Sequence, residues 1–378
     1  MDERVTATKP GRLNEASRYL ADHGLDGLIA ASNGLNNFLE SNAVYVFSGV
    51  RPIGESAVVL DRDGRSTLIV TPAGDEERAA ARSATERTIG TDDLAATLKH
   101  VVAAHRLDLS RSASVGLSLL GAGYFDRIAA ALGALPQPAD ELARELARIR
   151  TPEELADAER ATWIAERGYE RVLEFARPGI REYELAAELY CFCKELGAED
   201  NFLLMSASQH NLAVRAAGER LLDVGDIILS EITPCYRGQF AQICRTTVIG
   251  EPRPVIRDKY AILQGAMAEG LVAGRAGATV ADVTRAINGV IAKAGYGDYC
   301  RPPYMRVRGH GLGITSDRPG DIIDSNDRVL ESGMVFVMHP NQYLPESGYL
   351  MCGEPVVVTA SGCRSLSARQ STLDVIAV

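Results

Sequence analysis

The sequence predicts a chain of two domains, an α/β N-terminal domain followed by an α+β domain in which a curved antiparallel sheet is backed by helices. Three observations support this fold class. The length of 378 residues is enough for two separate cores. Helix and strand patterns alternate from about residue 10 to residue 145. After that region, a unit of helices followed by a glycine-started hairpin occurs twice, which indicates internal duplication.

The N-terminal region has the pattern of a small α/β domain. The expected helices are 13–23, 92–105 and 121–132, and the expected strands are 26–31, 56–60, 66–70 and 114–117. The strongest local signal is Asp-Arg-Asp-Gly at 61–64, which predicts a hairpin turn between two of these strands.

A second helix start places the domain boundary. Thr151-Pro152-Glu153-Glu154 has the spacing of a capping box with proline in the first turn, and the helical pattern continues to about residue 175. The sequence therefore predicts an N-terminal domain at 1–150 and a C-terminal domain at 151–378.

The C-terminal domain is expected to contain similar helices at 182–196 and 281–293, each followed by a hairpin, at 225–246 and 333–359. In the first hairpin, a strand at 227–229 leads to a turn at 236–238. Its inward-facing positions would lie close together across the two strands: Glu231, Gln242 and Cys244.

The composition excludes several classes of function. A net charge of −10 argues against a nucleic-acid partner. The first twenty residues have no apolar core of signal-peptide length, and no later run approaches a membrane span. Seven cysteines without zinc-like spacing indicate reduced thiols. We therefore expect a cytoplasmic protein that acts on a small molecule and contacts neither nucleic acid nor membrane.

Four motifs resemble those of the pita-bread enzymes, which include methionine aminopeptidase, aminopeptidase P, prolidase and creatinase. They are the 225–246 hairpin, Gly-His-Gly-Leu-Gly at 309–313, the run 330–340 ending in Met-His-Pro, and 354–362. The resemblance covers nearly the whole chain. It implies a pita-bread fold and a homodimer in which the N-terminal domain of one chain closes the neighbouring active site.

The metallopeptidases of this family bind two ions with Asp, Asp, His, Glu and Glu. On this sequence, the corresponding positions are Glu231, Gln242, His310, His339 and Gly353. Only the histidine keeps its identity. Two adjacent divalent ions need bridging carboxylates to offset their repulsion, and this set offers one. We therefore expect no metal ligands and no cofactor.

Creatinase and ectoine hydrolase are the relatives that lack metals and remain hydrolases. The pair His210-Asn211 stands where creatinase has its acid/base histidine. The resemblance implies a metal-independent hydrolase of a C–N bond in a small amino-acid-derived amidine, cyclic amidine or amide. Histidines would transfer protons and glutamates would orient the substrate. The expected catalytic residues are His210, His310, His339, Glu231 and Glu354.

Seven further residues are expected to bind the substrate: Phe47, Arg51, Gln242, Cys244, Arg306, Arg308 and Arg318. The first two resemble the Phe and Arg that creatinase inserts into the site of its partner subunit. The last three flank the His310 loop, where an arginine could pair with a substrate carboxylate.

Three alternatives remain open. Glu231, His310 and His339 form a two-histidine, one-carboxylate set that could hold mononuclear iron or zinc in a lyase, oxygenase or hydrolase. A non-enzymatic descendant could bind a ligand at the old site. Overall similarity also suggests an Xaa-Pro dipeptidase or aminopeptidase, although the ligand losses count against it.

Overall fold

The computed structural model describes residues 10–35, 38, 42–314 and 318–378. It divides into two compact units, Met1–Ala147 and Arg148–Val378, each with its own core. Residues 1–9 of the twenty-residue N-terminal stretch tested for a targeting signal lie outside the described residues. No helix in the described ranges is long and apolar enough to cross a membrane.

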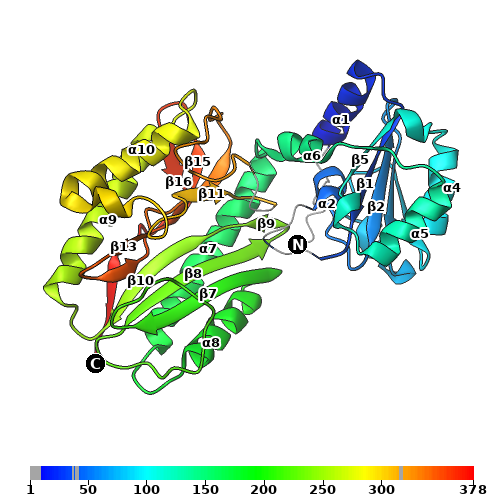
Figure 1. Ribbon diagram of the computed structural model, residues 1–378. Helices are drawn as coiled ribbons and strands as arrows, with labels where there is room; N and C mark the ends of the chain where they lie inside the picture. The colour runs from blue at the N-terminus through cyan, green and yellow to red at the C-terminus, as the bar shows by residue number, and fades with distance from the viewer. Residues whose placement is uncertain (1–9, 36–37, 39–41, 315–317) are drawn as a thin grey trace. The chain divides into compact units, whose positions relative to one another are not determined.

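The N-terminal unit is a six-stranded sheet in the order β4-β3-β2-β1-β5-β6, with helices against it (Figure 1). Its strands are β1 Gly27–Ser32, β2 Ser56–Asp61, β3 Ser66–Val70, β4 Arg87–Gly90, β5 Ser112–Val115 and β6 Gln137–Pro138. Its helices are α1 Pro10–Asp22, α2 Ala43–Ser48, α3 Glu76–Ala80, α4 Leu94–Ala104, α5 Ala122–Leu132 and α6 Asp140–Ala147.

Several features of this unit differ from the sequence-based expectation, among them the unpredicted strands β4 and β6 and helices α3 and α6. The strand expected at 114–117 ends at Val115, because Gly116 is left-handed with φ of 76° and Leu117 begins a short 3-10 turn. Helix α2 was not predicted. It is a wholly buried apolar turn, capped by Asn42 and Gly49, and such a short run has no visible helical period.

The C-terminal unit contains four long helices and several sheets. The helices are α7 Pro152–Phe175, α8 Glu182–Glu195, α9 Pro254–Ala273 and α10 Val280–Ile291. The first sheet contains β7 Asp200–Ser208, β8 Ile227–Tyr236, β9 Gln239–Phe240, β10 Ile243–Ile249 and β17 Leu373–Ile376. The second contains β11 Gly309–Gly311, β12 Val335–Met338, β15 Glu354–Val358 and β16 Cys363–Ser365, and a separate hairpin joins β13 Gln342–Leu344 to β14 Gly348–Leu350.

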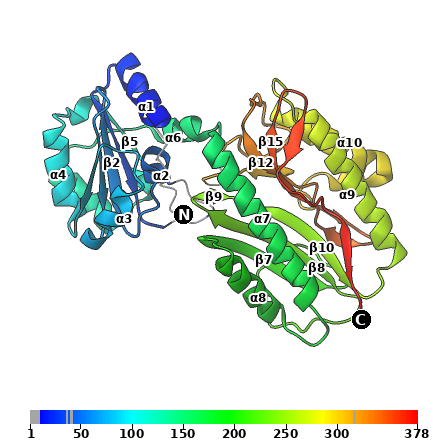
Figure 2. The ribbon, with the colours of Figure 1, turned by 180° about the vertical axis from the view of Figure 1, so that it is seen from behind.

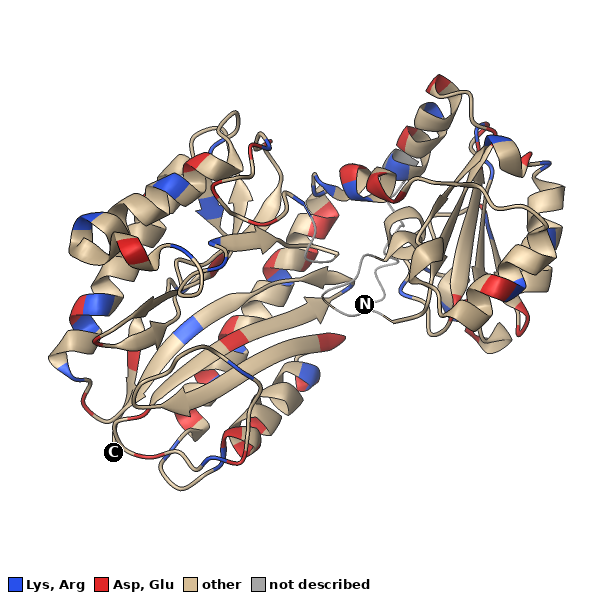
Figure 3. Ribbon diagram, in the orientation of Figure 1, with Lys and Arg blue, Asp and Glu red and all other residues tan. Residues whose placement is uncertain are grey.

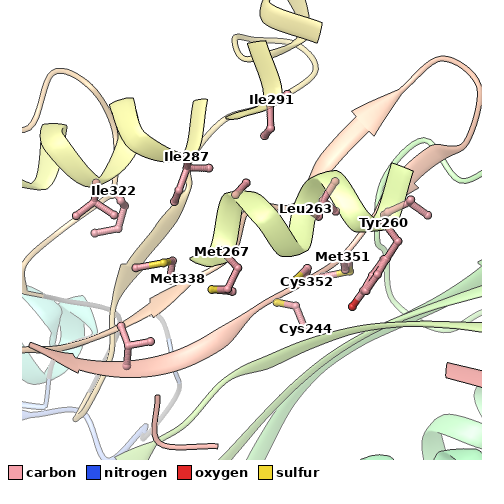
Figure 4. Packing of buried hydrophobic residues seen from close by; sticks show 14 of the residues in the cluster. Cys244, Tyr260, Leu263, Met267, Ile287, Ile291, Ile322, Met338, Met351 and Cys352 are labelled. Carbon is pink, nitrogen blue, oxygen red and sulfur yellow. The ribbon is translucent and has the colours of Figure 1, made fainter. Parts of the chain in front are cut away.

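These sheets are covered by helices, as the sequence predicts. Helices α7 and α8 lie along one face of the β17-β10-β8-β7 sheet (Figure 2). Helices α9 and α10 contribute Leu263, Met267 and Ile287 to a core that also contains Cys244 of β10 and Met338 of β12 (Figure 4). This core lies directly beside the predicted inward positions of the first hairpin.

The sheets are not wholly antiparallel. Strand β17 runs parallel to β10, so the sheet that contains the first hairpin is mixed. The hairpin pattern could not predict this pairing, because the strand returns from the far end of the chain. The first strand of the hairpin also extends from 229 to Tyr236, and the turn lies at Arg237 and Gly238, both with positive φ.

Charged residues lie mainly on helices and loops, and the strands carry few of them (Figure 3). Two central strands have one charged residue each, Glu231 on β8 and Arg245 on β10. Because a charge in a sheet core is costly unless it is paired or used, these two residues are candidates for a specific role.

Thr151→Ala tests the start of α7. The Thr151 hydroxyl accepts the Glu154 N–H at 3.2 Å, and the Glu154 carboxylate accepts the Thr151 N–H at 3.2 Å. We expect Thr151→Ala to lower the free energy of unfolding by about 1 kcal/mol, and Thr151→Ser to keep most of it. Guanidinium unfolding measures both, and equal stability of the two variants would contradict the capping role.

Candidate active site

The first hairpin and the second sheet meet at Cys244 and Gly353. The backbone N–H of each residue donates to the carbonyl of the other, both at 3.1 Å. On the other side of β10, Cys244 is the cross-strand partner of Glu231 on β8. Because cross-strand partners project from the same face of a sheet, Glu231 and Cys244 lie side by side.

Gly353 has no room for a side chain. A β carbon placed there would lie 2.7 Å from Cys244 Cβ and 2.9 Å from His339 Cβ. Cys244 and His339 therefore fill the space in which the resemblance places a glutamate ligand. Both side chains are buried, Cys244 completely and His339 to all but 7% of its surface.

His310 and His339 form an edge-to-face pair with ring centroids 5.6 Å apart. His310 Nδ1 lies 3.0 Å from the Gly311 carbonyl, which fixes Nδ1 as the donor and leaves Nε2 as an acceptor in the neutral ring. Burial lowers the pKa of His310, and burial together with His310 lowers the pKa of His339 to about 3. Both rings are therefore neutral near pH 7.

Glu231 and Gln242 complete the group. Within the described part of the chain, no hydrogen bond or ion pair reaches the partly buried Glu231 carboxylate, and burial raises its pKa to about 7. Gln242 is fully buried, with Nε2 3.8 Å from Cys244 Sγ. Among the described residues, neither Gln242 Oε1 nor His339 Nδ1 has a hydrogen-bond partner.

Glu354 does not belong to this group. Successive residues of a strand point to opposite faces, so Glu354 and Arg245 lie behind Gly353 and Cys244. There the Arg245 guanidinium lies 3.1 Å from the Glu354 carboxylate, and the Ser371 hydroxyl donates to that carboxylate at 2.6 Å. Arg245 also donates to the Gly353 and Arg369 carbonyls. The carboxylate of Glu354 is thus paired with Arg245 and Ser371, on the side of the strand that faces away from Glu231.

The three arginines near the His310 loop differ in environment. Arg308 is fully buried and donates to Asn288 Oδ1, the Asn341 carbonyl and Gln342 Oε1 at 2.7–2.9 Å. Burial lowers its pKa to about 10. Its donors are occupied, so it supports the 339–342 segment rather than offering a free charge. Arg306 is exposed and Arg318 is partly buried.

His210 lies away from Glu231 along the sheet. Leu204 pairs with Glu231, whereas His210 follows the end of β7, six residues later. At roughly 3.3 Å per residue, the strand portion of that separation alone is about 13 Å. His210 is exposed, with Nε2 3.0 Å from the Pro345 carbonyl and its ring edge on Tyr343.

Phe47 and Arg51 belong to the N-terminal unit. Phe47 is 1% exposed within that unit, as part of the apolar helix α2. The expectation that its ring reaches into a partner subunit is therefore wrong, because the ring already forms part of its own core. Arg51 is partly buried, and its carbonyl accepts a hydrogen bond from Arg78.

Two residues of the site were missed by the sequence analysis. Tyr349, on β14, has its pKa raised by burial and by the charges of Cys244 and Glu231, which places its hydroxyl near both. Asn341 Oδ1 accepts the Cys352 N–H at 2.8 Å, and the Asn341 carbonyl accepts from Arg308. The signal for Asn341 was its place directly after the Met-His-Pro motif, whereas nothing local marked Tyr349.

The donor set does not fit the two ions of the resembling metallopeptidases. It offers one carboxylate, an amide at Gln242 and no side chain at Gly353. Across the residues that the structure describes, no group of three or more His, Cys, Asp or Glu side chains could hold a metal ion. The mononuclear set of Glu231, His310 and His339 is not among such groups, so the described residues lend no support to that alternative.

Two family models match the chain. The model of metallopeptidase family M24 matches residues 156–360, and that of the creatinase/prolidase N-terminal domain matches residues 12–149. An uncharacterized peptidase, YqhT of Bacillus subtilis, is 30% identical over 61% of this chain and 65% of its own length. The Xaa-Pro dipeptidase of Pyrococcus furiosus is 24% identical over 96% of this chain and 99% of its own.

Solved structures give the same picture of the fold. An Xaa-Pro dipeptidase from Bacillus anthracis superposes with a TM-score of 0.83 at 22% identity, covering 96% of this chain and 99% of that one. Dipeptidase PepE from Mycobacterium ulcerans has a TM-score of 0.78 at 26% identity, with 97% of each chain covered. The pita-bread fold predicted from the motifs is thus confirmed.

These relatives correct the expected function. The expectation of a metal-independent hydrolase of a small amino-acid-derived amidine, cyclic amidine or amide is wrong, because the named relatives and structural neighbours are Xaa-Pro dipeptidases and other peptidases. Of the alternatives, these relatives favour the Xaa-Pro peptidase. His210 and the missing carboxylates resemble creatinase, whereas the similarity of the whole chain favours the peptidases.

Gly353→Ala tests the close contact at the centre of the site. A methyl group there must displace Cys244 or His339, so we expect a loss of about 1–3 kcal/mol in the free energy of unfolding. Gly289→Ala is the matched control, because its β carbon meets nothing within 4 Å and it lies in a helix. That control should be unchanged or more stable by about 0.5–1 kcal/mol. Equal effects at both positions would refute the crowding.

Glu231→Gln tests the raised pKa of Glu231. Its pKa is 4.5 in a free chain and about 7 in the folded protein, so the folded state holds the proton more tightly. The contribution of this tighter proton binding to the free energy of unfolding is fully present below pH 4.5. It declines by on the order of 2–3 kcal/mol as the pH rises to about 7. Glu231→Gln should flatten this slope, whereas Glu251→Gln at an exposed site should keep it. Denaturant unfolding at several pH values measures this dependence of stability on pH. A slope that is the same in Glu231→Gln as in the wild-type chain would contradict the raised pKa of Glu231.

Proposed function

Because the chain belongs to metallopeptidase family M24, we propose that it is a hydrolase that cleaves the amide C–N bond of a short peptide, with Xaa-Pro dipeptides as its substrate class. The similarity to the Xaa-Pro dipeptidase of Pyrococcus furiosus over nearly the whole of both chains supports this class.

The observation that carries the proposal is the convergence of Glu231, His310 and His339. They come from β8, β11 and the residue after β12, and the Cys244–Gly353 pairing brings those elements together. One of the three is a carboxyl group without a protein partner in the described residues, and the other two are neutral imidazoles that pack against each other. Titratable side chains with strongly shifted pKa values are typical of functional sites.

Hydrolysis requires water to add to the peptide carbonyl carbon and the C–N bond to break. One proton must leave the attacking water and one must reach the departing nitrogen. A carboxyl group that titrates near pH 7 is suited to both transfers, so Glu231 is the proposed acid/base. No step passes through a metal ion, because the donor set does not fit the ion pair.

The expected homodimer and the cytoplasmic location remain part of the proposal. The buried Phe47 cannot be the residue by which one subunit closes the site of the other. We retain Arg51 as the proposed residue by which one subunit closes the site of the other.

A second candidate function is the binding of a short peptide without turnover. The observation that favours it is the replacement of ligand carboxylates by Gln242 and Gly353, which removes the family's usual means of activating water. The two functions share a ligand class and differ only in whether the peptide bond is cleaved.

The release of proline from alanyl-proline distinguishes them. We expect the purified full chain to release free proline, and Glu231→Gln to slow that release by about 100-fold or more. Glu251→Gln, the same change at an exposed position, should leave the rate unchanged. Assays of a panel of Xaa-Pro dipeptides, with and without added Mn²⁺, give the answer by chromatography. Binding without proline release in every condition would support the second candidate instead.

A further inference from the structure

Two buried polar atoms at the site are unpaired among the described residues. Gln242 Oε1 and His339 Nδ1 have no hydrogen-bond partner among the described residues, and their side chains are 0% and 7% exposed. Buried polar atoms are nearly always satisfied, so two such atoms at one place point to a group that the protein binds there.

These atoms converge on the same place as Glu231. The Gln242 amide contacts Cys244 Sγ, and Cys244 and His339 both lie within 3 Å of the position that a Gly353 β carbon would take. Glu231 is the cross-strand partner of Cys244. Three groups therefore border Cys244: the carboxylate of Glu231, the amide oxygen of Gln242 and the imidazole of His339. All three are acceptors when the His339 ring carries its proton on Nε2.

When Glu231 is ionised, the charge at this place is negative, and it has no counter-ion among the described residues. The nearby buried cations are already used, Arg245 by Glu354 and Arg308 by the oxygens of Asn288, Asn341 and Gln342. A ligand that complements three acceptors and one negative charge carries a positive charge and several N–H donors. A primary ammonium group has three donors and one charge.

We propose that Glu231, Gln242 and His339 bind a primary ammonium group, at the position where the two-ion peptidases of the family hold metal. This inference rests on the proposed function for its ligand, the free N-terminus of a dipeptide. An ammonium group fits the set better than a pair of divalent ions, because one carboxylate neutralises one charge and the two neutral acceptors satisfy its remaining N–H bonds.

Calorimetric binding of two uncleavable probes tests the proposal. The probes are the ketomethylene isostere of alanyl-proline, in which carbon replaces the scissile nitrogen, and the same isostere with an acetylated amine. Acetylation removes the charge and two of the three donors. In the wild-type chain we expect it to weaken binding at least tenfold. In Glu231→Gln the two probes should bind within threefold of each other, whereas Glu251→Gln should behave as wild type.

Three outcomes would overturn the inference. They are equal binding of the two probes to the wild-type chain, binding of neither, and discrimination that survives Glu231→Gln. The wild-type comparison needs no variant, so it stands even if Glu231→Gln folds poorly. Retention of two Mn²⁺ ions per chain after buffer exchange, measured by elemental analysis, would also refute it, since the ions would occupy the same atoms.

The test separates this inference from the proposed function. Discrimination between the probes without proline release from alanyl-proline supports the ammonium site and rejects the peptidase. Proline release without discrimination supports the peptidase and rejects the ammonium site.

Discussion

The reciprocal hydrogen bonds between Cys244 and Gly353 are the contact on which the candidate site depends. They join a strand of the first sheet to the start of a strand in the second, and so bring Glu231 and His339 together from positions far apart in the sequence. The contact is possible at this distance because Gly353 has no side chain, and both neighbours occupy the space it leaves. A larger residue would push the sheets apart or displace a side chain of the site.

This crowding explains why the unusual residues of the site occur together. With Gly353 enclosed by Cys244 and His339, no carboxylate could be restored at that position alone. Gln242 contacts the same cysteine, so a change at one position alters the surroundings of the others. The chain belongs to a family of metallopeptidases. It keeps one carboxylate and the family histidine, His310, but has an amide at Gln242, a second neutral imidazole at His339 and no side chain at Gly353. Such a set suits hydrogen bonding and proton transfer better than the binding of paired ions.

The sequence predicted those parts of the molecule that depend on local pattern. The capping box at Thr151, the hairpin around Glu231 and the proximity of Gln242 and Cys244 follow from spacing and strand alternation, and the motifs indicated the fold. Partners distant in the sequence were not predictable. Nothing in the order of residues shows that Glu354 pairs with Arg245, that β17 lies parallel to β10, or that Phe47 is enclosed by its own unit. The function was mistaken because the identity of single residues was weighed above the similarity of the whole chain.

Arg245 links the site to the C-terminal end of the chain. Its guanidinium holds the Gly353 carbonyl from behind, and it also contacts Ser371 and the Arg369 carbonyl, shortly before β17. The strand that carries Cys244 is therefore held in register partly by residues that lie more than a hundred positions later. Any loosening of this tail, whether by truncation, by a bulky fusion or by a nearby mutation, would be transmitted through one side chain to the geometry around Glu231.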